Sequence, residues 1–291
     1  MYKEELYYIC VKTDTGILSI DNIRIAFEAH ERYLHYIADF FSQITRIDIE
    51  KYPESSKLGS YRHLWTIRYT PDASMTIGLE FNGTNHQEDR LKGYLDFNPN
   101  KVGRIEQFWR DYDTLKQWCI FDIKRCDIAY DVPIHRERVR MVKDRRKYRI
   151  DSKSLQDFTE YLGQRNKEGF VKVYNKQIES DLDEPLTRIE VTCKFDITSY
   201  FCMFPKVYVI NDGKQITIDD PKLNDYDKVI LTMACDLLGL GGDPFQALML
   251  FQRPDKRKKL VELMPVEPLP LPFVDVVHQL VTKYEEVLKL S

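Results

Sequence analysis

The segment GFVKVYNKQIESDLDEPLTRIEVT, residues 169–192, is the most informative part of the chain about its fold. It contains two strand-like runs in which polar and apolar side chains alternate. Successive side chains of a β-strand point to opposite faces, so the polar residues of each run share one face. These polar residues are Lys172, Tyr174, Lys176, Arg188 and Glu190. The alternation predicts two antiparallel strands, each with one apolar face and one polar face.

A third strand with the same character is expected upstream, in CIFDIKRCDIAYDVP, residues 119–133. Asp127 and Asp131 are four residues apart in it and therefore share a face, about 13 Å apart along an extended strand. We expect Asp127, in the middle of the strand, to be the more functional of the two. Asp131 precedes Val132-Pro133 and could simply end the strand.

Strands and helices alternate irregularly through the remainder of the first two thirds of the chain. The patterns predict further strands at residues 5–12, 61–70, 74–82 and 91–99, and a hairpin formed by 155–163 and 170–177. They predict helices at 19–43 and 104–118. This order favours an α+β fold on a mostly antiparallel sheet rather than a doubly wound fold.

The last third of the chain changes character. Helices are expected at residues 226–240, 243–252 and 273–290, with a proline-rich spacer at 265–273. We therefore predict one domain over residues 1–210 and a helical C-terminal region over residues 211–291.

Composition limits the class of protein. The 291 residues carry a net charge of −3, so any surface for nucleic acid must be a local patch. The six cysteines show no CxxC spacing, which favours reduced thiols in a cytoplasmic protein over a zinc site. No apolar run is long enough to span a membrane, and no signal peptide is expected.

The three polar strand faces together suggest a chemistry. Each face alone is what a half-exposed antiparallel sheet shows. Together they offer carboxylates that suit Mg²⁺ or Mn²⁺, cations that stabilise charge on a phosphodiester, and a tyrosine. The unperturbed pKa of tyrosine is about 10, and we expect the nearby cations to lower it and help the phenol to ionise. This combination predicts attack of a tyrosine on a DNA phosphate.

A basic run occupies residues 136–149, with eight Lys or Arg side chains against two acids. Such a run is usually a solvated loop. Its position between two candidate site strands favours an arm that contacts DNA phosphates through residues such as Arg145 and Arg146. Tyr148 within it could stack on an unpaired base.

Four segments resemble the Rep_trans family of rolling-circle replication initiators. YLGQRNKEGFVKVYNK resembles the family's tyrosine segment, and TRIEVTCK looks like its R-x-E strand. KRCDIAYDVP resembles its R-x-D-(I/L)-A-x-D strand, and GYLDFNPNK is similar to sequences of this group. The matches cover residues 90–195 in the family's order. The serine of the family's glycine-serine-arginine element is replaced by Gln164 here, and no His-hydrophobic-His triplet is present.

The resemblance implies a nicking and joining enzyme. Residues 1–210 would then form the catalytic domain, and the helical region 211–291 would serve DNA binding, dimerisation or contact with a partner. Tyr174 would attack an origin phosphodiester and remain linked to the 5′ end, while Asp127, Asp131 and Glu190 would bind a divalent metal ion. The residues expected to contact DNA phosphates are Lys172, Lys176, Arg188, Arg165, Arg145 and Arg146. The partners implied are origin DNA, single-stranded or extruded as a hairpin, a possible host helicase and a second copy of the chain.

Alternatives remain open at this point. Tyr161, one strand earlier in the hairpin, is the rival nucleophile. The same residues would serve a relaxase of a conjugative element, which acts on a transfer origin. A different class is a sequence-specific DNA-binding protein without cleavage activity. A third is an unrelated structural protein whose strand motifs match by chance.

Overall fold

The structure is a computed structural model. It describes residues 7–33, 36–37, 40, 47–50, 63–80, 90–142, 144–154, 157–194, 203–211, 218, 221, 223–239, 261, 263–270 and 274–288. The helix expected at 243–252 lies outside these residues. No helix among them is long and apolar enough to cross a membrane.

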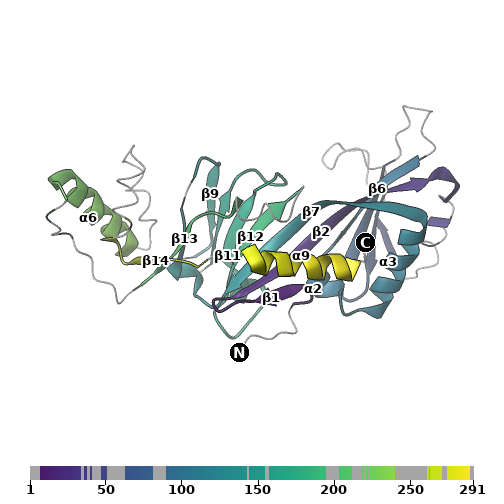
Figure 1. Cartoon of the computed structure of the whole chain (residues 1–291), viewed down its shortest axis with the longest axis horizontal. Coiled ribbons are helices and arrows are strands. Elements are labelled where there is room, and N and C mark those ends of the chain that lie inside the picture. Colours follow the sequence, from purple (N-terminus) through teal and green to yellow (C-terminus); the bar gives the residue numbers. More distant parts are fainter. Residues whose placement is uncertain are drawn as a thin grey trace.

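A large antiparallel sheet dominates the molecule (Figure 1). Its strands run in the spatial order β3-β4-β5-β6-β2-β7-β12-β11-β10-β9, and β1 pairs with β2 outside this path. In chain order they are β1 (Cys10–Lys12), β2 (Ile17–His30), β3 (Ile47–Glu50), β4 (His63–Arg68), β5 (Ser74–Glu80), β6 (Arg90–Phe97), β7 (Cys119–Val132), β9 (Tyr148–Ser152), β10 (Phe158–Leu162), β11 (Val171–Asn175) and β12 (Thr187–Cys193). The predicted α+β class with a mostly antiparallel sheet is confirmed.

Short helices and a second sheet complete the fold. The helices and turns are η2 (Glu31–Tyr33), α2 (Pro99–Val102), α3 (Glu106–Trp118), η3 (Arg136–Arg138), α4 (Lys176–Glu179), α6 (Asp225–Gly239) and α9 (Val274–Leu288). The second sheet has the order β14-β13-β8 and consists of β8 (Val139–Met141), β13 (Val207–Ile210) and β14 (Val266–Pro268). β14 falls within the predicted proline-rich spacer.

The segment 19–43 was expected to form one or two helices, and that prediction was wrong for residues 19–30, which belong to the long strand β2. Residues 36, 37 and 40, later in the same segment, are helical. Strand alternation is clear at Ile23, Ile25 and Phe27, which are buried. It is interrupted because the register of β2 against β7 shifts between Ile20 and Asn22. This β-bulge places two residues between the buried side chains of Ile20 and Ile23, and that three-residue spacing imitates a helix.

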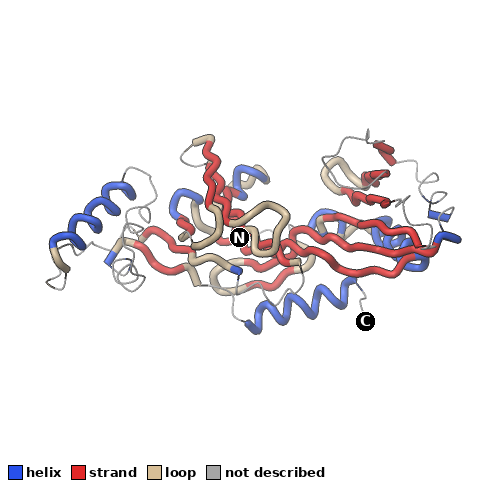
Figure 2. Tube along the Cα trace, turned by 90° about the horizontal axis from the view of Figure 1, so that it is seen from above, coloured by secondary structure: helices blue, strands red, loops and turns tan. Residues whose placement is uncertain are grey.

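The main core lies on one face of the large sheet. Side chains of β2, β7, β11 and β12 pack there with α3 and with α9, whose Leu280 and Tyr284 are buried. Helix α9 runs along β1 and β2 and lies beside the sheet rather than within it (Figures 1 and 2). The chain therefore returns to the large sheet at its C-terminal end.

Helix α6 lies at the end of the molecule opposite α3 (Figure 1). Its Ile230, Leu231 and Ala234 form a second, smaller core with Met264 and Val266 of the β14 region. The predicted domain boundary at residue 210 stays a prediction. The two cores show that the C-terminal third contributes both to the small sheet and to the core of the large one.

Candidate active site on the polar face of the sheet

The face of the large sheet opposite the main core is polar where β2, β7, β12 and β11 lie side by side. Strand register places the predicted tyrosine, the three predicted carboxylates and two of the predicted cations on it. Tyr174 of β11 pairs with Arg188 of β12, which pairs with Asp131 of β7. In the next row, Lys172 pairs with Glu190. The structure thus brings the tyrosine, the two cations and two carboxylates of the prediction to one region.

Tyr174 sits among charges rather than in an apolar interior. Its side chain is 6% exposed, and the Lys172 ammonium lies 3.8 Å from the centre of its ring. Burial raises the pKa of the Tyr174 phenol well above its ordinary value; the charge of Arg188 opposes this, and Glu190 and Asp21 add to it. The expectation that nearby cations lower this pKa was therefore wrong for the protein as it stands, because burial and the carboxylates outweigh them.

Arg188 is fully engaged with two acids. Its Nε donates to Asp131 Oδ1 at 2.7 Å, its Nη2 donates to Asp131 Oδ2 at 2.6 Å, and its Nη1 donates to Asp21 Oδ1. Although burial alone lowers the pKa of Arg188, the charges of Asp131 and Asp21 raise it well above its ordinary value. Arg188 is therefore a permanent positive charge beside Tyr174 and orients both acids.

Asp131 is buried completely, and Tyr7 Oη donates to its Oδ2 at 2.7 Å in addition to the two bonds from Arg188. Bidentate pairing of this kind fixes a guanidinium in one orientation. The contacts favour a role for Asp131 in holding Arg188 over the predicted role as a metal ligand, which stays a prediction.

Glu190 has the most perturbed carboxyl group of the site. Burial raises its pKa to about 7; Lys172, whose Nζ lies 3.8 Å from Glu190 Oε2, opposes the rise, and Asp21 and Asp127 add to it. A carboxyl with a pKa near neutrality exchanges a proton readily at physiological pH. Glu190 therefore feels the negative charge of two neighbouring carboxylates, Asp21 and Asp127.

Asp127 lies farther from the tyrosine than expected. It pairs with Thr192, four residues along β12 from the Arg188 row, which corresponds to about 13 Å of strand. Arg125 binds it through two bonds, one of them Nε to Oδ1 at 3.0 Å. Glu190 lies on β12 midway between Arg188, which faces Tyr174, and Thr192, which faces Asp127.

Asp21 was missed by the sequence reasoning, because the segment around it was assigned to a helix. It is the extra residue of the β2 bulge, so it and Asn22 both fall on the polar face. Besides the bond from Arg188, Asn98 Nδ2 donates to its Oδ1 at 3.4 Å. The charge of Arg188 helps to lower the pKa of Asp21, although burial opposes this.

The other side chains predicted to contact DNA phosphates differ in how exposed they are and in whether they already have partners in the protein. Arg165 and Arg145 are exposed. Lys176 is paired with Glu179 on the next turn of α4. Arg146 Nη1 donates to the carbonyl oxygens of Gly169 at 2.7 Å and Met203 at 2.9 Å, so this side chain joins three segments of the fold.

Part of the basic run 136–149 is internal, so these residues do not form the exposed arm that was expected to contact DNA. Arg136 is 1% exposed and paired with Glu160, and its guanidinium lies 3.9 Å from the centre of the Phe158 ring. Tyr148 donates to the same Glu160 at 2.8 Å, which occupies its hydroxyl group inside the fold. Part of the positive charge of the run is therefore paired with acids inside the fold.

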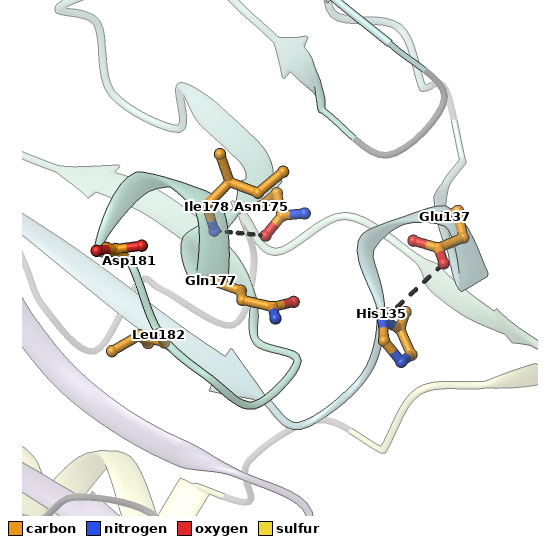
Figure 3. Close-up of a pocket in the computed structure, with 7 residues that line it drawn as sticks. All are labelled: His135, Glu137, Asn175, Gln177, Ile178, Asp181 and Leu182. Carbon is orange, nitrogen blue, oxygen red and sulfur yellow. Dashed lines mark hydrogen bonds and ion pairs between the residues drawn. The ribbon is translucent and has the colours of Figure 1, made fainter.

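A cavity of about 390 Å³ lies next to the end of β11, between η3 and α4 (Figure 3). Its lining is mixed and includes His135, Gln177, Ile178 and Leu182. Asn175, the residue after Tyr174, also lines it and accepts a hydrogen bond from the Ile178 amide at 3.0 Å. No side chain predicted to take part in chemistry lines this cavity.

The predicted metal ion would need Asp, Glu, His or Cys side chains that lie close together. Among the residues that the structure describes, no three Asp, Glu, His or Cys side chains are grouped closely enough to hold an ion as they stand. The charges of Asp21 and Asp127 nevertheless help to raise the pKa of Glu190, and carboxylate oxygens are the donors that Mg²⁺ and Mn²⁺ prefer. A dication would relieve the repulsion that helps to raise the pKa of Glu190.

The amino-acid sequence is similar to those of proteins that initiate replication. It is 26% identical to a replication initiation protein of Staphylococcus aureus over 122 residues, or 39% of each chain. A second S. aureus replication initiation protein is 26% identical over 186 residues, or 59% of each chain. The matches therefore span 39% to 59% of these relatives' own lengths. No family model matches the chain.

The chain is also similar to a solved structure described as a rolling circle replication initiator protein from Geobacillus stearothermophilus. The superposition has a TM-score of 0.39 at 11% identity and covers 64% of this chain and 78% of the other. A likeness of this strength supports no inference by itself.

Proposed function

We propose that this protein initiates rolling-circle DNA replication by nicking and rejoining origin DNA through Tyr174. The observation that carries the proposal is the position of Tyr174, beside Lys172, Arg188 and Glu190 on one sheet face. The relatives named replication initiation proteins favour replication over conjugative transfer, for which the same residues would serve.

The proposed reaction exchanges one phosphodiester for another. The Tyr174 Oη proton passes to a carboxylate oxygen of Glu190, whose pKa of about 7 suits it to accept a proton near neutrality. The phenolate oxygen then forms a bond to phosphorus as the bond from phosphorus to the 3′ oxygen breaks. Glu190 returns the proton to that oxygen, which leaves a free 3′-OH and a 5′-phosphotyrosyl linkage.

The cations stabilise charge in this scheme. Lys172, with 31% of its side chain exposed, can contact the non-bridging phosphate oxygens directly. Arg188 is held by its two acids and acts as a fixed charge that favours the phenolate once the proton has left. Rejoining needs no ATP, because the phosphotyrosyl ester keeps the energy of the cleaved bond.

We also propose that the reaction depends on Mg²⁺ or Mn²⁺ bound by Glu190, Asp127 and Asp21. When bound, the ion would polarise a phosphoryl oxygen. Binding also requires Asp127 to give up part of its pairing with Arg125.

The test is formation of a covalent adduct. Wild-type protein, incubated with single-stranded origin DNA and Mn²⁺, is expected to yield a DNA-linked species of lower mobility under denaturing conditions. Tyr174→Phe should abolish it, and Tyr226→Phe on the distant helix α6 serves as the matched control. The mass of the tryptic peptide that carries a nucleotide identifies the linked residue.

Three outcomes would contradict the proposal in different ways. Loss of the adduct in Tyr161→Phe rather than in Tyr174→Phe would move the nucleophile to Tyr161. DNA binding without an adduct would favour a binding protein without cleavage activity. Failure to bind any DNA would favour the chance-match alternative.

A further inference from the structure

A second set of polar and aromatic side chains continues from Tyr174 toward the edge of the sheet. Register places Arg149 of β9 opposite Tyr161 of β10, and Tyr161 opposite Lys172 of β11. Directly paired residues of an antiparallel sheet share a face, so this row lies on the face that carries Tyr174. It ends at β9, which is the last strand of the sheet.

The aromatic rings in this region are already stacked. The rings of Tyr161 and Phe170 lie 5.9 Å apart between centres, with their planes inclined by only 19°. The Arg149 guanidinium lies 4.4 Å from the centre of the Tyr161 ring. Tyr161 and Phe170 are both half-buried, so parts of their rings remain open to solvent. Guanidinium, tyrosine and phenylalanine thus form a preordered stack.

Exposed cations surround the stack. Arg149 has 62% of its side chain exposed, and Arg165 and Lys167 are exposed in the turn between β10 and β11. Arg149 is also paired with Asp151 at 2.9 Å, so its charge is partly compensated within the protein. With Lys172, the group still presents four positive side chains along a path that leads to Tyr174.

We propose that this surface, defined by Arg149, Tyr161, Phe170 and Lys172, binds the single-stranded DNA that flanks the bond cut by Tyr174. An unpaired base extends the stack of rings, and the cations follow the phosphates. Aromatic rings beside a positively charged groove are how proteins hold single strands without reading their sequence. Double-stranded DNA cannot use the site, since its bases are already stacked on one another.

This inference rests on the proposed function, which identifies the bound DNA as the strand cut by Tyr174. The role it adds is DNA binding, and the residues that carry it lie beside the proposed cleavage site. Tyr148, which was expected to stack on a base, has its hydroxyl bound to Glu160, and Tyr161 takes that role here. Tyr161 is therefore a binding residue rather than the rival nucleophile. Binding of a base would require the ring of Tyr161 but not its hydroxyl group.

Binding can be measured apart from cleavage. Fluorescence anisotropy with a 12-nucleotide oligothymidine is carried out in EDTA on the Tyr174→Phe background, where no adduct forms. Tyr161→Leu, which removes the flat ring but keeps an apolar side chain, is expected to weaken binding about 5- to 100-fold. Tyr161→Phe should bind within about twofold of its parent, because it keeps the ring. Tyr226→Leu on α6 is the matched control.

A spectroscopic signal reports the stacking itself. The fluorescence of a single 2-aminopurine in the oligonucleotide is expected to fall on binding to the parent protein and to stay high with Tyr161→Leu. Equal affinity and equal quenching for Tyr161→Leu and its parent would overturn the stacking role, whatever the adduct assay shows. An absent adduct together with Tyr161-dependent quenching would instead overturn the nicking reaction and leave this surface in place.

Discussion

Replacing Glu190 by glutamine should change how the stability of this protein depends on pH. Glu190 has a pKa of about 7 in the folded protein, against an ordinary value of 4.5. The folded state therefore holds more protons than the unfolded state between those two values. Stability contributed by the protonated form is fully present below pH 4.5 and is lost as the pH rises through 7.

The size of the effect follows from the shift. A difference of about 2.5 pKa units corresponds to roughly 3 kcal/mol, at about 1.4 kcal/mol per unit. The side chain is 14% exposed, so solvent screening reduces this figure only modestly. The pKa of about 7 already includes the attraction of Lys172, which lowers it. Glu190→Gln is neutral at every pH and should lose this dependence.

The assay is urea unfolding of wild type and variant at several pH values between 4.5 and 8. The free energy of unfolding of Glu190→Gln, relative to wild type, should rise by about 3 kcal/mol over this interval. Glu179→Gln provides a matched control. Burial raises the pKa of Glu179, but its bond and charge interaction with Lys176 lower it overall. The stability that Glu179 contributes is therefore present above pH 4.5 and lost only below it, so the difference between this variant and wild type should stay nearly constant from pH 5 to 8 and change only at lower pH.

A difference between wild type and Glu190→Gln that stays constant from pH 5 to 8 would refute the reasoning. It would mean that Glu190 is hydrated in solution, or that a rearrangement of Lys172 compensates its charge fully. Either result would also remove the basis for Glu190 as the group that accepts the Tyr174 proton near neutral pH.

Three further predictions follow from the site and the sheet. Arg188→Met should lower the free energy of unfolding by about 3 to 5 kcal/mol in urea titrations, because it leaves Asp131 buried without its charge partner; a loss below about 1 kcal/mol would contradict the buried pair. Gly93→Ala should lower it by about 1 to 3 kcal/mol, since an added Cβ would lie 2.4 Å from Phe27 Cζ and 2.5 Å from the Gly78 carbonyl oxygen; an unchanged melting temperature would contradict that packing. Mn²⁺ should raise the melting temperature of wild type but not of Glu190→Gln; an equal rise in both would place the ion elsewhere.

Strand alternation made much of the candidate site predictable. The runs around Lys172, Tyr174 and Glu190 alternate without interruption, so their shared face could be inferred before the register was known. The same reasoning failed for β2, because a bulge shifts the alternation by one residue at Asp21. A bulge is set by how two strands fit together, and nothing local in the sequence marks it.

The partners of charged residues were the least predictable feature. Arg136 and Glu160, or Arg188 and Asp21, are far apart in the chain, and only the register of the sheet brings them together. A basic run therefore looked like a solvated arm until its acids were located. The raised pKa of Tyr174 has the same origin, since burial and distant carboxylates decide it rather than the neighbouring lysines.

Stability alone gives no reason for the charges of the polar face. Buried ion pairs such as Arg188 with Asp131 contribute little net stability compared with apolar side chains of similar size, because burial removes their hydration. A sheet that needed only to fold would be at least as stable with apolar residues there. A phenol that must lose its proton under burial needs both a fixed positive charge and a proton acceptor. In the proposed reaction Arg188 and Glu190 would meet these two requirements, and the bonds of Arg188 to Asp131 and Asp21 hold its charge beside Tyr174.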